Sequence, residues 1–266
     1  MSNHFQTNYS QWVKNLFNDL HEYDLKGDAA SLHDLRIGMK KIRSIISFLR
    51  TIYPKQKLKK ASHKIRVIFQ EAGEIREYHL LQQWLTKNEL TSFDQQYLPK
   101  HTLQNLTDTF HQQAATNKQV LKEVTVEVGK YVQATNQILA EQYVADLQAQ
   151  IKTVTKKRPA TDEWHSLRKL IKQWMYAINW IGNGEDTKTE AKLYHYKRLQ
   201  EAIGYWHDAA VMRDTLYRKQ IYLSQDMEVQ KDFTRACAKL NQSIRYRERR
   251  IRGLLNLFVS LPGRGE

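Results

Sequence analysis

Residues 32–44 read LHDLRIGMKKIRS, and residues 164–176 read WHSLRKLIKQWMY. The two stretches share a pattern, in which His33, Leu35, Arg36 and Lys40 correspond to His165, Leu167, Arg168 and Lys172. A second motif is also repeated: the tripeptide Gln-Glu-Ala comes shortly before Gly73 and again shortly before Gly204. Two motifs that recur at nearly the same offset predict two copies of one unit about a pseudo-two-fold axis. We place the boundary near Pro159, which gives an N-terminal half at 1–158 and a C-terminal half at 159–266.

Apolar side chains recur every three or four residues around both motifs, as in Leu35, Met39, Ile42, Ile46 and Leu49. This spacing is that of one face of a helix and not the alternation of a strand. Glycine and proline are scarce, which disfavours an all-β fold. The sequence therefore predicts an all-α fold of antiparallel helix bundles, in two copies. The expected helices are 5–25, 29–52, 56–88, 92–113, 117–152, 162–181, 188–223 and 226–259.

The composition narrows the class of protein. The chain has 266 residues, with 42 Lys and Arg against 28 Asp and Glu, and a formal net charge of +14. Its single cysteine, Cys237, excludes an internal disulfide framework and a cysteine-based zinc cage. No apolar run approaches the roughly 20 residues of a membrane span, and no signal peptide is evident. We expect a cytoplasmic protein without a membrane partner.

The positive charge is concentrated in four blocks, at 36–50, 55–66, 156–172 and 245–252, whereas residues 81–150 are slightly acidic. One such run is usually a solvated helix face. Four runs in a chain this basic favour a polyanionic partner.

The repeated motif places cations beside the core. At about 100° per residue, His33, Arg36, Lys40 and Arg43 fall in one arc next to the apolar stripe. His165, Arg168 and Lys172 do the same in the second copy, and Tyr176 continues the arc. Cations in such a position repel one another unless an anion lies between them. The two rows predict a cleft suited to phosphate.

These residues resemble the CHAD family (conserved histidine α-helical domain), whose pattern runs His-x-x-Arg-x-x-x-Lys/Arg-x-x-Arg and then Leu-Gly-x-x-Arg/His-Asp, duplicated. The resemblance spans about residues 10–258. It implies two four-helix bundles facing each other across a basic central cavity that binds inorganic polyphosphate without catalysis. Two departures are Met175 in place of the second arginine and Glu77 in place of the aspartate.

We therefore expect a polyphosphate-binding protein, in the cytoplasm and at polyphosphate granules, with no catalytic residue, metal site or cofactor. His33 and His165 would bind the anion better when protonated, so binding should be stronger at pH 6 than at pH 8. The expected ligand residues are His33, Arg36, Lys40, Arg43, Lys64, Arg66, Arg76, His165, Arg168, Lys172, Tyr176, Lys197, Arg198, His207, Arg245 and Arg249.

Two alternatives stay open. His33-Asp34 and His207-Asp208 suggest a metal-dependent phosphohydrolase of the helical HD type, although Asp34 points about 100° away from His33 on a helix. The net charge also fits a generic nucleic-acid binder, but no zinc finger, basic zipper or RNA-recognition signature is present. A purely structural scaffold would leave the bordering cations unexplained.

Overall fold

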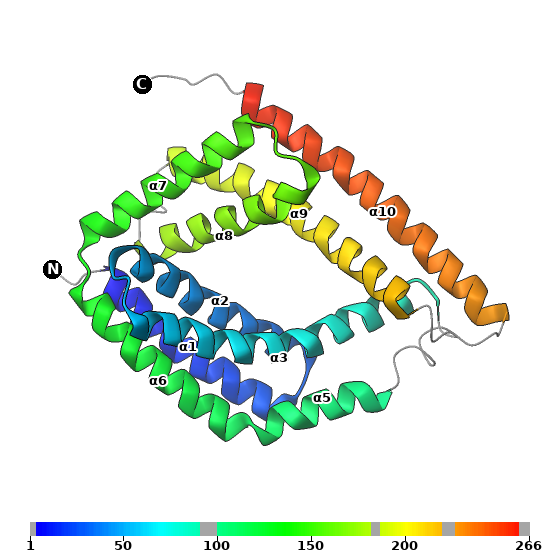
Figure 1. Cartoon of the computed structure of the whole chain (residues 1–266), viewed down its shortest axis with the longest axis horizontal. Coiled ribbons are helices and arrows are strands. Elements are labelled where there is room, and N and C mark those ends of the chain that lie inside the picture. The colour runs from blue at the N-terminus through cyan, green and yellow to red at the C-terminus, as the bar shows by residue number, and fades with distance from the viewer. Residues whose placement is uncertain (1–3, 91–99, 182–186, 220–226, 261–266) are drawn as a thin grey trace. The chain divides into compact units, whose positions relative to one another are not determined.

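The computed structural model describes residues 4–90, 100–181, 187–219 and 227–260, and all regular structure in them is helical (Figure 1). The predicted all-α class is confirmed. The elements are α1 (His4–Lys26), α2 (Ala29–Ile52), α3 (Gln56–Lys87), α5 (Lys100–Gln112), α6 (Ala114–Ala134), α7 (Gln137–Lys156), the 3-10 turn η1 (Thr161–Glu163), α8 (Trp164–Ile181), α9 (Thr187–Lys219) and α10 (Met227–Ser260).

The single helix predicted over 117–152 is wrong, because two helices, α6 and α7, cover this stretch. Thr135 leaves the helix with an extended backbone, φ −94° and ψ 134°. The Asn136 side chain then accepts a hydrogen bond of 2.9 Å from the amide of Leu139. Asparagine is a favoured N-cap residue, so Asn136 starts a new helix where the apolar pattern alone suggests continuity.

Three further predicted helices extend past the described residues. The prediction at 92–113 includes residues 92–99, the prediction at 188–223 includes residues 220–223, and the prediction at 226–259 includes residue 226; these lie outside the described part of the chain. The described portions of all three are helical, in α5, α9 and α10. Within the described residues, no helix is both long and apolar enough to serve as a membrane span.

The chain divides into two compact units. Unit 1 comprises Met1–Lys87, Leu98–Tyr143 and Asn179–Gly182; unit 2 comprises Asn88–Tyr97, Val144–Ile178 and Asn183–Glu266. The division falls within α7 and again near the end of α8. The predicted boundary at 158/159 separates the two sequence repeats, and it stays a prediction.

In unit 1 four helices enclose one core. Helix α1 packs on α2, α2 on α3, α3 on α6, and α6 returns to α1. The last turn of α8 joins this unit through Trp180, whose ring lies 4.8 Å from that of Phe5 and 4.7 Å from that of Phe48. The residues that close this core are fully buried: Leu16, Leu35, Ile65, Leu121 and Val128.

The start of α2 is fixed by the short turn after α1. Gly27 has φ +62°, a conformation that suits glycine, and lets the chain reverse after α1. Asp28 then caps α2, because its carboxylate accepts a hydrogen bond of 2.7 Å from the Ser31 amide. This turn sets the rotation of α2, and hence the direction of the motif that begins at His33.

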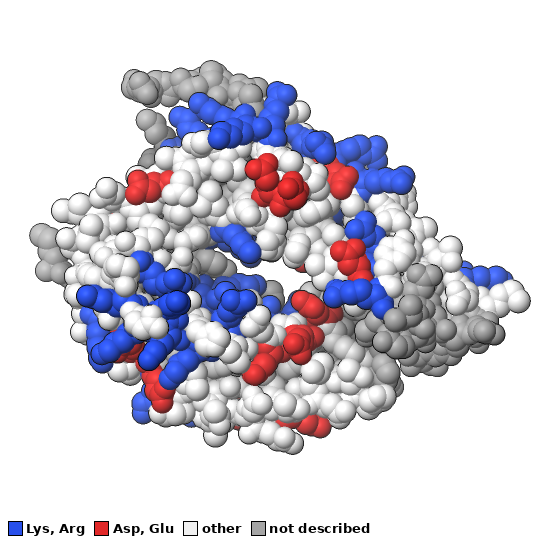
Figure 2. Space-filling view, in the orientation of Figure 1, with Lys and Arg blue, Asp and Glu red and all other residues white. Residues whose placement is uncertain are grey.

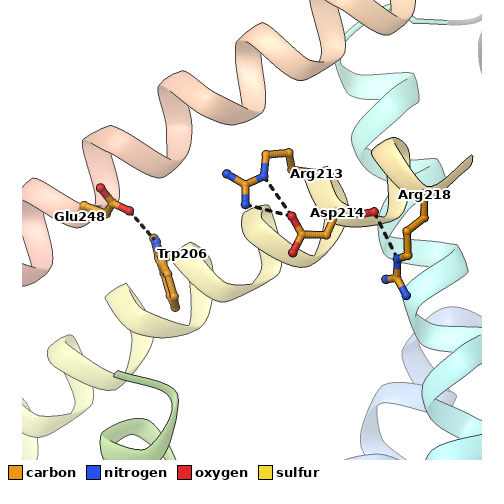
Figure 3. A network of polar contacts seen from close by, with 5 residues as sticks. All are labelled: Trp206, Arg213, Asp214, Arg218 and Glu248. Atoms are coloured by element: carbon orange, nitrogen blue, oxygen red, sulfur yellow. Dashed lines mark hydrogen bonds and ion pairs between the residues drawn. The ribbon is translucent and has the colours of Figure 1, made fainter. Parts of the chain in front are cut away.

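Unit 2 is held by tryptophan contacts and by a long helix pair. Trp164 of α8 packs edge-to-face on Trp206 of α9 at 5.2 Å, and Trp174 packs on Tyr196 at 5.0 Å. Helix α9 packs along α10. Trp206 also donates a hydrogen bond of 3.3 Å from Nε1 to Glu248 of α10 (Figure 3). The motif of α8 is thereby fastened against α9.

Candidate functional site

In unit 1, three cations of α2 gather around one aromatic ring of α3. The guanidinium carbons of Arg36 and Arg43 lie 4.1 Å and 4.6 Å from the centroid of the Phe69 ring. The Lys40 ammonium lies 5.7 Å from the same centroid. A ring face attracts cations, so Phe69 provides a surface on which like charges can collect. We call Arg36, Lys40, Arg43 and Phe69 the Phe69 cluster.

Arg36 lies flat against the backbone of α3. Its Nη1 donates a hydrogen bond of 2.7 Å to the carbonyl oxygen of Phe69. A Cβ atom placed on Gly73 would lie only 2.9 Å from this nitrogen. The guanidinium can occupy this place because residue 73 has no side chain.

The charges of the Phe69 cluster are only partly compensated. Burial lowers the pKa of Arg36 to about 10; Glu77 raises that pKa, and Arg76 and Arg43 lower it. The pKa of Arg43 is also lowered, by burial and then by Arg66. Neither Arg36 nor Arg43 forms an ion pair with any carboxylate in the described part of the chain. Both remain charged at neutral pH, in a place where charge is costly without an anion.

Unit 2 repeats the contact between arginine and glycine. Arg168 of α8 lies over Gly204 of α9, and a Cβ on Gly204 would meet its Nε at 3.0 Å and its Nη2 at 3.1 Å. Beside this contact, the rings of His165 and His207 lie 4.5 Å apart at their centroids. We call His165, Arg168, Lys172, Gly204 and His207 the Gly204 cluster.

Two polar atoms of the Gly204 cluster are buried without a partner among the described residues. These atoms are the Nε of Arg168 and the Nδ1 of His165. Burial lowers the pKa of His165, and the positive charges of Lys169, His207 and Arg168 lower it further. A buried donor that lacks an acceptor, such as the Arg168 Nε–H, is costly, so an anion bound here would be stabilising.

The remaining residues of α8 share this environment. Burial lowers the pKa of Lys172, and Arg168 adds to the effect, whereas Asp208 and Glu201 act in the opposite direction. Burial raises the pKa of the Tyr176 phenol, and Arg168 opposes that shift. Both residues therefore lie within electrostatic reach of Arg168, as the sequence predicts for one arc of the helix.

The two clusters differ at corresponding positions. The residue four positions before the glycine is Phe69 in α3, whereas it is Gln200 in α9. Arg43 corresponds to Met175, so unit 2 lacks both the aromatic platform and the third cation of unit 1. Three residues after the glycine, Arg76 corresponds to His207, which makes the Gly204 cluster the histidine-rich member of the pair.

Four other predicted ligand residues lie in unit 1. Arg66 precedes Gly73 by two helical turns and lies close enough to Arg43 to lower its pKa. Arg76 Nη1 donates a hydrogen bond of 3.4 Å to the carbonyl of Ala29, and His33 is exposed near the start of α2. Lys64 differs, because its ammonium forms an ion pair of 2.7 Å with Glu123 of α6. It lies in a groove between α3 and α6, also lined by Lys57, Lys60 and Glu127.

The other predicted residues of unit 2 are more exposed. Lys197 precedes Gly204 by two turns of α9 and is exposed. The Arg198 guanidinium lies 5.4 Å from the centroid of the Tyr194 ring. Arg245 and Arg249 are on the exposed face of α10, and the structure does not bring them into the Gly204 cluster.

Sequence reasoning misses Phe69 and the role of the two glycines. Phe69 precedes Gly73 by one turn and so shares its helix face, which is a signal that the spacing contains. The prediction treats Gly73 and Gly204 only as marks of the repeat, whereas the structure shows arginine lying over each.

Asp34, one of the two carboxylates on which the phosphohydrolase alternative relies, lines a small pocket between α1 and α2 with Asp19 and Lys41. Within the described residues, no group of three or more His, Cys, Asp and Glu side chains is placed to hold a metal ion.

The fold and the two clusters define an all-α protein with half-buried cations next to its helical cores. The family model of the CHAD domain matches residues 5–217, and the chain belongs to the CHAD family. A search of curated proteins finds no match.

The structure is similar to the crystal structure of the CHAD domain from the plant Ricinus communis. The TM-score is 0.75 at 17% sequence identity, over 96% of this chain and 91% of that chain. At this identity the similarity concerns the fold.

Proposed function

We propose that this protein binds inorganic polyphosphate through the Phe69 cluster and the Gly204 cluster. The observation that carries the proposal is the arginine held against a glycine in each unit, Arg36 on Gly73 and Arg168 on Gly204. Each arginine is half-buried among other cations and has no ion-paired carboxylate within the described residues. Membership of the CHAD family, which is linked to polyphosphate binding in general, supports the same conclusion.

The chemistry of the ligand matches these clusters. A polyphosphate chain offers closely spaced negative charges and many acceptor oxygens. The planar guanidinium of arginine binds two such oxygens, whereas lysine supplies a mobile point charge. A hydrogen bond to a charged group contributes about 1.5–3 kcal/mol net, so a few of them give tight binding. Bound phosphate would also restore the depressed pKa values of Arg36, Arg43 and Lys172 toward their ordinary range.

The repeated contact between arginine and glycine also supports the proposal that the units are two copies of one bundle. The basic central cavity that the family resemblance implies is part of this proposal. A long polymer that bound both clusters would gain overall affinity without new contacts.

We further propose binding without hydrolysis. The experiment is to incubate the purified protein with long-chain polyphosphate and Mg²⁺ or Mn²⁺ and to follow free phosphate and chain length. We expect an unchanged chain length. Shortening that depends on the metal and is abolished in His207→Ala would instead favour the HD-type phosphohydrolase.

A competition experiment separates polyphosphate binding from generic attraction to polyanions. Labelled long-chain polyphosphate is bound and then challenged with duplex DNA at equal phosphate concentration and fixed salt. We expect DNA to displace little of the polyphosphate, because half-buried cations are easier for a thin single chain to reach than for a duplex. If duplex DNA displaced the labelled polyphosphate as well as unlabelled polyphosphate does, the binding would be generic polyelectrolyte attraction.

A protein that holds long polyphosphate in this way is suited to attach to polyphosphate granules in the cytoplasm. A fluorescent fusion should co-localise with these granules, and the Arg36→Gln/Arg168→Gln variant of the fusion should be diffuse. A granular distribution of that variant would contradict this role.

A further inference from the structure

The outer face of α10 carries an arginine-rich surface separate from both clusters. Four exposed arginines lie within two turns, and exposed tyrosine side chains accompany them (Figure 2 shows the charge along α10). Tyr246 is 58% exposed on α10, and Tyr205 of α9 is 54% exposed. We call Arg245, Tyr246, Arg249 and Arg250 the α10 strip; Arg252 is not part of it, because its guanidinium lies 5.6 Å from the centroid of the Trp164 ring of α8.

The α10 strip forms one continuous surface. Arg249 and Arg250 follow Tyr246 by three and four residues, so all three side chains lie on the same helix face. Arg245, Arg249 and Arg250 form no ion pair within the described part of the chain. The one acid of this stretch, Glu248, is turned toward α9, where it accepts the hydrogen bond from Trp206 (Figure 3). Within the strip itself, the exposed charges are therefore all positive.

The aromatic side chains show what kind of polyanion this surface suits. The ring of an exposed tyrosine can stack on a nucleobase, a contact that inorganic polyphosphate, which has no bases, cannot make. Next to the strip, the Arg247 guanidinium lies 5.1 Å from the centroid of the Tyr205 ring and is held by a hydrogen bond from its Nε to Ser243. This arrangement offers a second flat surface for a base.

The basic surface of unit 1 provides a contrast. The start of α3 and the residue before it carry Lys55, Lys57, Lys59 and Lys60, without an aromatic residue among them. The α10 strip combines arginine with tyrosine, whereas the surface at the start of α3 has lysine alone. Only the α10 strip can therefore both bind phosphate and stack on a base.

We propose that the α10 strip binds single-stranded nucleic acid, with the arginines on phosphates and Tyr246 stacked on a base. Stacking requires an unpaired base, so the strip should prefer single strands to duplexes. Glu201 and Asp208 flank Tyr205 on α9, so the strand should run along α10 and not across α9. This site is independent of the proposed polyphosphate clusters.

The test measures the affinity of fluorescein-labelled oligo(U), of duplex RNA and of polyphosphate for wild type and Tyr246→Ala. Because the change removes no charge, we expect oligo(U) affinity to fall about 5-fold or more. Affinities for duplex RNA and polyphosphate should stay within about 2-fold, and Tyr246→Phe should behave as wild type. Tyr194→Ala, which removes a tyrosine that is 59% exposed outside the strip, is the matched control.

The ratio of oligo(U) affinity to duplex affinity gives a second readout. We expect Tyr246→Ala to bring this ratio close to one. An unchanged oligo(U) affinity in Tyr246→Ala, an equal loss in Tyr194→Ala, or an equal loss for polyphosphate would overturn the proposal. Failure of polyphosphate binding in wild type would contradict the proposed function and leave the prediction for oligo(U) intact.

Discussion

At the scale of single residues, Gly73 and Gly204 determine where an arginine can lie. We predict that Gly204→Ala, and separately Gly73→Ala, lowers polyphosphate affinity. The new Cβ would meet Arg168 at 3.0 Å or Arg36 at 2.9 Å and displace the guanidinium. Loss of one charge-assisted bond corresponds to roughly 10-fold in affinity. Isothermal titration with long-chain polyphosphate measures it.

Gly253→Ala is the control for this prediction. Gly253 lies in α10, and a Cβ there would meet nothing within 4 Å. Alanine is the better helix former, so this variant should be slightly more thermostable and bind polyphosphate as wild type does. If Gly73→Ala and Gly204→Ala behaved like Gly253→Ala, the glycines would have no positioning role.

The histidines of the Gly204 cluster should make binding depend on pH. Because the pKa of His165 lies below its ordinary value, this ring is neutral in the free protein at neutral pH. Bound phosphate favours the protonated ring, so binding takes up a proton and affinity rises as pH falls from 8 to 6. Titrations at fixed ionic strength measure this slope.

The pH prediction has its own control. His165→Gln/His207→Gln should flatten the slope, whereas His63→Gln, a change at an exposed histidine of α3, should preserve it. In the unliganded protein the same lowered pKa means that protonation opposes folding, so the contribution of His165 to stability is present above the unfolded-state pKa near 6.5 and is lost as pH falls from there through the lower folded-state pKa. An affinity that is flat between pH 6 and pH 8 in wild type would refute a charged role for these rings.

Part of the site could be predicted residue by residue, and part could not. The positions of Arg36 and Arg168 on an inward arc follow from helix periodicity within a single element. Arg36 contacts Phe69, which lies 33 positions further along the chain. Lys64 forms its ion pair with Glu123, which lies 59 positions further along. Such contacts depend on how two helices pack, which local patterns do not encode.

At the scale of the elements, periodicity predicts helices well and their breaks less well. The predicted helix at 29–52 has the same bounds as α2, because Asp28 at one end and Tyr53-Pro54 at the other are strong local signals. The break between α6 and α7 is missed because buried apolar residues continue on both sides, at Val132 and Ala140. The deciding feature is the cap at Asn136, a single hydrogen bond.

The cap of α2 gives a testable prediction at this scale. Asp28→Ala removes the acceptor of the Ser31 amide and should lower the melting temperature by about 2–4 °C. Asp28→Asn keeps an acceptor and should melt close to wild type. The hydrogen bonds from Ser31 lower the pKa of Asp28, so this stabilisation is present above its unfolded pKa and lost as pH falls through the folded value. Equal melting temperatures for Ala and wild type at pH 7 would show that the cap is not needed.

At the scale of the whole molecule, the internal repeat is the most informative sequence feature. It leads to the family and hence to the all-α fold, both of which are confirmed. Which segments of the chain belong to each unit could not be predicted in the same way. The end of α8 belongs to unit 1 because Trp180 packs with Phe5 and Phe48. No local pattern indicates that residues so far apart form one aromatic cluster.

The most direct test of the central claim is a polyphosphate titration of Arg36→Gln/Arg168→Gln against Arg50→Gln/Arg218→Gln. Both double variants remove two positive charges, but Arg50 and Arg218 are exposed and lie outside the clusters. With folding verified by circular dichroism, we expect the first pair to lose about 100-fold in affinity, the loss of two charge-assisted bonds, and the second to lose less than about 3-fold. Equal losses in the two pairs, or full affinity in the first, would contradict the account.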